Sequence, residues 1–168
     1  MNFYLASGTP DFMETLQAKY ANENMILLYG EGNSILMHET EKKSKFATPR
    51  RFEVVEGRGT FEQRGFIAMH NVPVADESMR LFEENVVKAI QPLKNNKACI
   101  AFRVLRPVKH EMYVIVTQWA GPASFEVWTE SAEFEASLAR LIANATSITQ
   151  AMFTSKAYVT RFSAPVQE

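Results

Sequence analysis

The chain has 168 residues, of which 46% are hydrophobic and 22% charged, and its net charge is −1. This length can bury a core without staples, and the one cysteine, Cys99, rules out an internal disulfide. The sequence lacks both the basic stripe that nucleic-acid binding needs and an apolar run near the roughly 20 residues that span a bilayer. We therefore expect no nucleic-acid partner and no membrane span. The first residues lack a signal-peptide pattern, which predicts a cytoplasmic protein.

The first half predicts the element order β-α-β-β-β. A short strand at 3–6 precedes Thr9-Pro10-Asp11, where Thr9 can cap a helix and Pro10 suits its first position. Apolar residues at helical spacing then predict its buried stripe, namely Phe12, Leu16 and Tyr20. Three β-rich runs follow, at 25–29, 35–38 and 52–55, and a glycine-containing hairpin loop joins the first two.

The second half predicts β-α-β-β-α-β, the ferredoxin-like order. A strand at 66–74 leads to a helix that Asp76 can cap, and Pro92 marks the end of that helix. Its buried stripe is Met79, Phe82, Val86, Ile90 and Leu93, whereas Glu83 and Glu84 are expected on its solvated face. A half-buried strand at 100–105, a returning strand at 113–119, a helical region at 122–142 broken near Ser131, and a last strand at 158–166 complete the order.

These patterns indicate an α+β fold in two parts. Residues 1–62 would form the N-terminal α+β half and residues 63–168 a ferredoxin-like domain. Because an amphipathic sheet must bury its apolar face, we expect the first half to pack on the sheet of the second. The chain would then be a monomeric pseudo-dimer. The alternative is a homodimer in which a second copy supplies the cover.

Several segments resemble one known family, the heme-degrading monooxygenases of the antibiotic biosynthesis monooxygenase (ABM) fold. The segments are Gly8-Thr9-Pro10-Asp11-Phe12, 35–40, 52–55, 103–107, 113–119 and 158–160. The whole chain is most similar to two-part members, the HmoB-like proteins and the TRAP signal-transduction or stress proteins of Gram-positive bacteria. The resemblance implies an ABM-type ferredoxin-like fold. It also implies oxidoreductase chemistry in which heme is both cofactor and substrate and is opened by an oxygen-dependent reaction.

The resemblance also implies where site residues would lie. Heme-degrading members use an Asn on the first strand, a Trp on the second helix, and an iron-binding His about ten residues after the Trp. Here the Trp is Trp128, the Asn position holds His70, and the His position holds Leu138. Asn71 is a weak substitute, because a one-residue slip in a strand turns the side chain to the opposite face. The cofactor-binding candidates are Trp128, His70, Leu138 and Phe134.

Leu138 changes the expected chemistry, because heme iron needs a donor atom from His, Cys, Met or Tyr. His70 then has two interpretations, as an iron ligand from the opposite wall or as a hydrogen-bonded strand histidine. Trp128 likewise is either a cofactor contact or a core residue. His38 and His110 are expected to be structural or solvated, and three histidines so far apart predict no metal site apart from His70 in a heme complex.

Three functions follow from these observations. The first is a heme-monooxygenase-like protein that binds heme, with the family's turnover in doubt because the triad is incomplete. The second is a non-catalytic TRAP-type regulatory or stress protein that acts through a protein partner. The third is a binder of a small hydrophobic ligand or a cofactor-free monooxygenase, since one fold hosts several chemistries. The sequence leaves open whether the protein is an enzyme.

Overall fold

Within the described residues, eight strands form one closed antiparallel barrel in the order β1-β3-β2-β8-β5-β7-β6-β4. The computed structural model describes residues 1–109, 112–150 and 156–166. The strands are β1 (Asn2–Gly8), β2 (Met25–Tyr29), β3 (Ser34–Thr40), β4 (Arg50–Arg58), β5 (Phe66–Pro73), β6 (Cys99–Pro107), β7 (Met112–Trp119) and β8 (Tyr158–Ser163).

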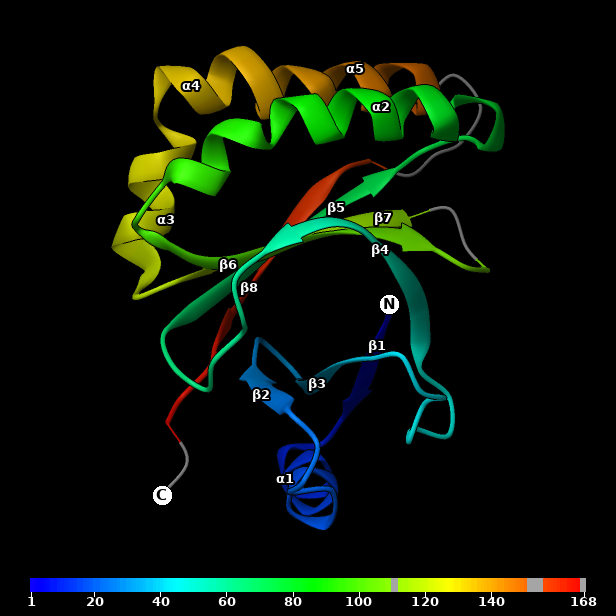
Figure 1. Ribbon diagram of the computed structural model, residues 1–168, viewed down its shortest axis with the longest axis vertical. Helices are drawn as coiled ribbons and strands as arrows, with labels where there is room; N and C mark the ends of the chain where they lie inside the picture. The colour runs from blue at the N-terminus through cyan, green and yellow to red at the C-terminus, as the bar shows by residue number, and fades with distance from the viewer. Residues whose placement is uncertain (110–111, 151–155, 167–168) are drawn as a thin grey trace.

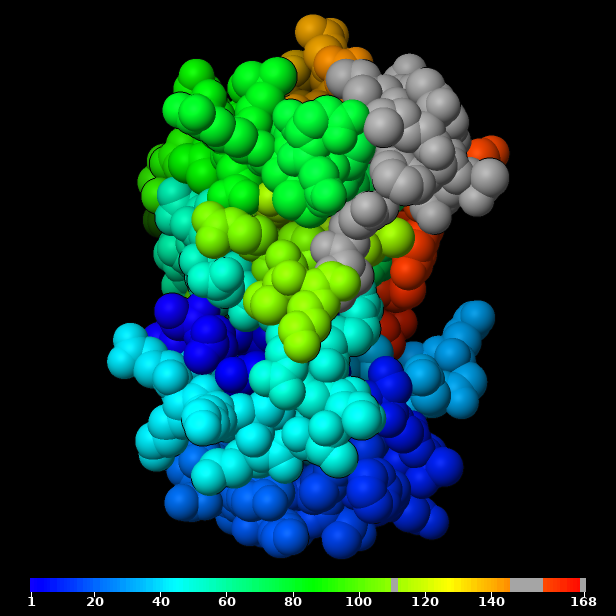
Figure 2. All heavy atoms as spheres, turned by 90° about the vertical axis from the view of Figure 1, so that its right-hand side faces the viewer, coloured from blue at the N-terminus to red at the C-terminus, as the bar shows by residue number. Residues whose placement is uncertain are grey.

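The helices lie in two places outside the barrel (Figure 1). Helix α1 (Pro10–Lys19) packs below β1, β2 and β3, whereas α2 (Met79–Ala89), α3 (Pro122–Thr129), α4 (Ala132–Phe134) and α5 (Arg140–Gln150) cover the sheet at the other end. A space-filling view from the side shows the resulting tiers, with α2 above, barrel strands between and α1 below (Figure 2). The predicted β-α-β-β-α-β order of the second half is confirmed, and with it the ferredoxin-like α+β fold.

Local signals explain where the helices begin and break. The Thr9 side chain accepts a hydrogen bond from the backbone N–H of Phe12, and Pro10 takes the first helical position, as predicted. Ser131 interrupts the long C-terminal helical region, as predicted, because its hydroxyl accepts from the N–H of Phe134 and starts a new helix. A π-helical turn (Glu135–Ala139) then connects α4 to α5.

The two halves of the chain join edge to edge rather than standing apart. Strand β4 pairs with β6 over Phe52–Arg58, and β2 meets β8 at one residue pair, Tyr29 with Ser163. The barrel interior is a shared apolar core in which Phe3 and Leu5 pack with Ile67 and Val116. The first half therefore covers the sheet of the second within one chain, as predicted. The boundary between residues 62 and 63 stays a prediction.

Two glutamine side chains, Gln63 and Gln118, hydrogen-bond the backbone of other segments of the barrel. The Gln63 amide accepts from the backbone N–H of Leu27 at 2.8 Å and donates to the Leu27 carbonyl at 2.7 Å. It thus replaces a neighbouring strand along this edge of β2, where backbone groups need partners. Gln118, which is fully buried, binds the backbone of Glu62 and Arg64 in the same way.

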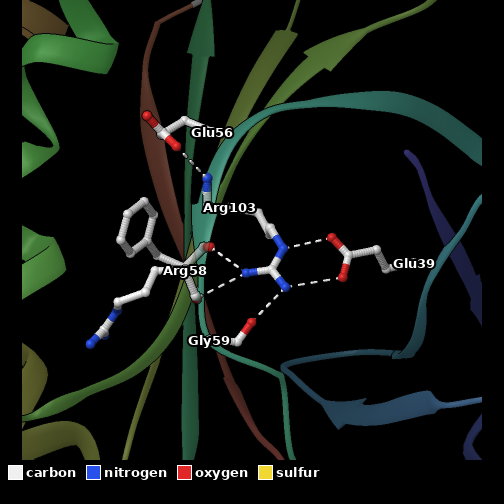
Figure 3. A network of polar contacts seen from close by, with 7 residues as sticks. Glu39, Glu56, Arg58, Gly59 and Arg103 are labelled. Atoms are coloured by element: carbon white, nitrogen blue, oxygen red, sulfur yellow. Dashed lines mark hydrogen bonds and ion pairs between the residues drawn. The ribbon is translucent and has the colours of Figure 1, made fainter.

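A buried arginine also links the halves (Figure 3). Arg103 on β6 donates to both carboxylate oxygens of Glu39 on β3, at 2.6 and 3.0 Å. The same guanidinium donates to the carbonyl oxygens of Arg58 at 2.9 Å, Gly59 at 2.7 Å and Phe102 at 2.7 Å. The Arg103 guanidinium therefore donates to five acceptor atoms in the wall of the barrel.

A second ion cluster fastens α2 to the sheet and corrects one expectation. Glu83 does not lie on a solvated face: it accepts two hydrogen bonds from Arg106, at 2.9 and 2.8 Å, and one from the Tyr113 hydroxyl. The Arg106 guanidinium is the main cause that holds the pKa of Glu83 below its usual range. Glu84, by contrast, remains on the exposed face with Arg80.

Three further local predictions were wrong. In α1 the buried residue is Met13 and not Phe12, which is 59% exposed, because the face toward the barrel runs through Met13 and Leu16. Asp76 begins a 3₁₀ turn (Asp76–Ser78) and makes no side-chain cap to α2. Strand β6 is buried on both faces and not one, since helices cover one side and the closed barrel the other. His110 lies outside the described residues.

Candidate functional site

A cavity of about 580 Å³ lies between strands β5 and β8 and the helices above them. Its described lining is mostly apolar, with one histidine and two cations. The lining residues are His70, Phe125, Thr129, Phe134, Ala139, Ile142, Ala143, Lys156, Ala157, Val159 and Arg161. Ligand sites of this kind combine an apolar wall with few polar groups in volumes of about 300–1,000 Å³. The cavity is therefore the candidate ligand site.

The alternation of β5 decides which side chains reach this cavity. Ala68 and Val72 face the helices, Ile67 and Met69 face the barrel interior, and His70 belongs to the helix-facing set. Asn71 consequently lies on the opposite face, where its amide donates to the Met69 and Tyr158 carbonyls and to the Thr160 hydroxyl. Asn71 lines a separate cavity of about 440 Å³ on the barrel side.

His70 is enclosed by aromatic rings and is 5% exposed. The ring centroids of Phe125 and Phe134 lie 5.8 Å from its own, and that of Trp128 lies at 6.0 Å. Its Nδ1 atom is buried and has no hydrogen-bond partner among the described residues. Burial, and secondly the positive charge of Arg161, lower the pKa of His70 from 6.5 to about 4. The imidazole is therefore neutral at neutral pH.

This lowered pKa predicts acid-sensitive stability. The unfolded chain binds a proton on His70 below about pH 6.5, whereas the folded chain does so only near pH 4. The contribution is fully present above pH 6.5 and is lost as the pH falls toward 4. Between pH 7 and 4.5, wild-type protein should lose roughly 2–3 kcal/mol more unfolding free energy than His70→Gln, measured by urea denaturation. Parallel losses in the two proteins would contradict the assignment to His70.

The remaining predicted site residues divide between the cavity wall and the core. Phe134 lines the cavity. Trp128 is 5% exposed and packs against Phe134 at 4.6 Å and Trp119 at 5.2 Å between ring centroids, yet it is not part of the lining. Leu138 is 1% exposed and belongs to the same core. In the π-helical turn, whose hydrogen bonds join residues five apart, Ala139 is the residue that reaches the cavity.

Sequence reasoning did not single out two cations of this wall, Lys156 and Arg161. Arg161 lies on β8, opposite Ala68 of β5, and its guanidinium carbon is 5.6 Å from the Phe125 ring centroid. The alternation of β8 was the only signal for it: Val159 and Arg161 share a face, and Val159 pairs with His70.

No group of three His, Cys, Asp or Glu side chains within the described part of the chain could hold a metal ion. No helix among the same residues is long and apolar enough to cross a bilayer.

Comparison with known proteins finds a matching family and related sequences. Residues 65–140 match the family described as antibiotic biosynthesis monooxygenase. The chain is 23% identical over 126 residues to the signal transduction protein TRAP of Staphylococcus epidermidis, covering 75% of each chain. It is 23% identical over 132 residues to the Staphylococcus aureus protein of the same name, covering 79% of each.

Two solved structures share the whole fold. A major regulator of staphylococcal pathogenesis superposes with a TM-score of 0.88 at 18% identity, covering 99% of this chain and 100% of that one. LmHde, a heme-degrading enzyme from Listeria monocytogenes, superposes with a TM-score of 0.76 at 17% identity, covering 98% and 100%. At these identities the likeness is one of fold.

Proposed function

We propose that this chain, which carries an antibiotic biosynthesis monooxygenase domain at residues 65–140 and is related to the TRAP proteins, binds heme or a similar flat apolar ligand beside His70. One observation carries the proposal. A neutral, buried imidazole, whose Nδ1 has no hydrogen-bond partner among the described residues, lines a mostly apolar cavity of about 580 Å³. Histidine ligates heme iron in its neutral form, so this side chain needs no proton removed at neutral pH.

The residues present fit binding of such a ligand but not the family's turnover. His70 offers a donor atom, and Phe125 and Phe134 offer flat apolar walls. Heme, when bound, would bring an iron that an imidazole can ligate. Leu138 has no donor atom and is packed in the core, and Asn71 faces the barrel side. We therefore propose a binding protein, in which Trp128 supports the wall from behind.

A second function is favoured by the TRAP relatives, which match three quarters of the chain. In this alternative the protein is a non-catalytic regulator that acts through a protein partner. Ligand binding and regulation are compatible, because occupancy of the cavity could bias such contacts. A role in stress response and a cytoplasmic location stay predictions.

Titration of the purified protein with hemin tests the proposal. Wild-type protein should develop a saturable Soret band, and His70→Ala should lose it while keeping the wild-type circular dichroism spectrum. His38→Gln, at a histidine on β3 that does not line the cavity, should bind as wild type. If wild type gives no saturable band, the heme proposal fails. If His70→Ala keeps the band, His70 is not the iron ligand.

A further inference from the structure

We propose that the ligand of the cavity beside His70 carries an acidic group and that Arg161 is the residue that binds it. This inference rests on the proposed function, because it concerns the same cavity. It adds a chemical class to the ligand, a flat apolar acid, and assigns a specificity-determining role to a residue outside the family's triad.

The first step is the charge of the wall. The described lining contains two cations, Lys156 and Arg161, and no Asp or Glu. The only other titratable lining group is His70, which is neutral at neutral pH. Both cations are exposed, and charges of one sign around a cleft attract ligands of the opposite sign. The cavity therefore selects for anions as well as for apolar surface.

The second step is the state of the Arg161 guanidinium. Two buried or half-buried arginines hold carboxylates, since Arg103 binds Glu39 and Arg106 binds Glu83. Half-buried Arg58 instead donates to the Cys99 carbonyl. Arg161 has no carboxylate within ion-pair distance among the described residues. A guanidinium presents a planar fork of donors that matches a carboxylate with two parallel hydrogen bonds. The Arg161 side chain is exposed and, within the described ranges, its fork has no carboxylate partner, so a ligand can reach it.

The third step is placement. The guanidinium carbon of Arg161 lies 5.6 Å from the Phe125 ring centroid, and that ring lies 5.8 Å from the imidazole of His70. Stacking on Phe125 holds the cation against the wall and directs its plane. The cation, the aromatic wall and the imidazole thus follow one another along the cavity. A flat molecule lying on this wall would place an acidic substituent at Arg161.

Strand β8 separates the candidate ligand site from a second cavity. Val159 and Arg161 line both this cavity and the one of about 440 Å³ on the barrel side. The acidic group would therefore lie where β8 separates the two spaces. The apolar body of the ligand would remain on the helix side, where the lining is aromatic and aliphatic.

A metal-free porphyrin tests the anchor separately from iron ligation. Protoporphyrin IX, a dicarboxylic acid, and its neutral dimethyl ester share one ring and are titrated by fluorescence. Wild-type protein should bind the acid at least about tenfold more tightly than the ester. Arg161→Gln should weaken acid binding by a similar factor and leave ester binding unchanged. Arg161→Lys should recover part of the loss, because it keeps the charge but not the fork.

Arg80→Gln is the matched control, since the Arg80 side chain is 93% exposed on α2, and it should bind both porphyrins as wild type. Equal affinity of wild type for acid and ester, or an unchanged Arg161→Gln, would overturn the anchor. A protein that binds hemin but not protoporphyrin IX would also overturn it, and would leave the His70 proposal standing. Failure to bind either hemin or porphyrin would overturn both proposals together.

Discussion

Replacing Arg103 with Met should lower the free energy of unfolding by about 3–5 kcal/mol. Arg103 is a buried cation that joins the halves of the barrel, and its side chain is 10% exposed beside a Glu39 side chain that is 24% exposed. Its removal leaves the Glu39 carboxylate and three backbone carbonyls without their donor. A buried charge without a partner is costly, whereas the intact pair offsets its own desolvation. Urea denaturation followed by tryptophan fluorescence measures the loss.

The control is the exposed pair Arg64–Glu62, whose side chains are 48% and 50% exposed. Arg64→Met should cost less than about 1 kcal/mol, because solvent screens such pairs. A loss at Arg103 as small as that at Arg64 would contradict the view that the barrel depends on this contact.

Truncating Trp128 to Ala should cost about 3–5 kcal/mol of unfolding free energy even without any ligand. The indole is packed against Trp119, Phe125 and Phe134, and its loss would leave a cavity that these rings cannot fill. The near-ultraviolet circular dichroism should weaken, because the aromatic cluster loses its fixed packing. The adjacent Val127→Ala, at a side chain 71% exposed, should change stability by no more than about 0.5 kcal/mol.

This result separates the two interpretations of Trp128. A core residue supports the fold before any ligand is present, whereas a pure ligand contact would leave stability nearly unchanged and reduce binding alone. A Trp128→Ala protein as stable as Val127→Ala would therefore restore the cofactor-contact interpretation.

Local patterns predicted most elements of the fold because their causes are local. Thr9 and Pro10 specify a helix start, and Ser131 specifies a break, through contacts within one turn. Closure of the barrel was not predictable in this way, because it depends on β4 meeting β6 about fifty positions further along. The error at β6 has the same origin: an alternating strand has two buried faces only when a distant segment covers the second.

The candidate site was also predictable only where its causes are local in the sequence. Alternation in β5 and the family resemblance together singled out His70, and the structure places it in the cavity wall. Leu138 was expected to line that wall, but the π-helical turn directs it into the core, and nothing in its residues distinguishes this turn from an ordinary helix. The sequence does not distinguish Arg161, because a single arginine in a strand is more often a solvated residue, and its side chain is indeed exposed beside the cavity.

The seam between β2 and β8 has a mechanical consequence. Neighbouring strands elsewhere in the barrel pair over several residues. Strands β2 and β8 pair only at Tyr29 and Ser163, and the Gln63 side-chain amide adds two hydrogen bonds to the backbone of β2. Thermal fluctuations should unroll the barrel from this side first. The strand that would separate is β8, which also carries Arg161. Opening of the barrel at this junction should therefore also weaken the binding of an acidic ligand.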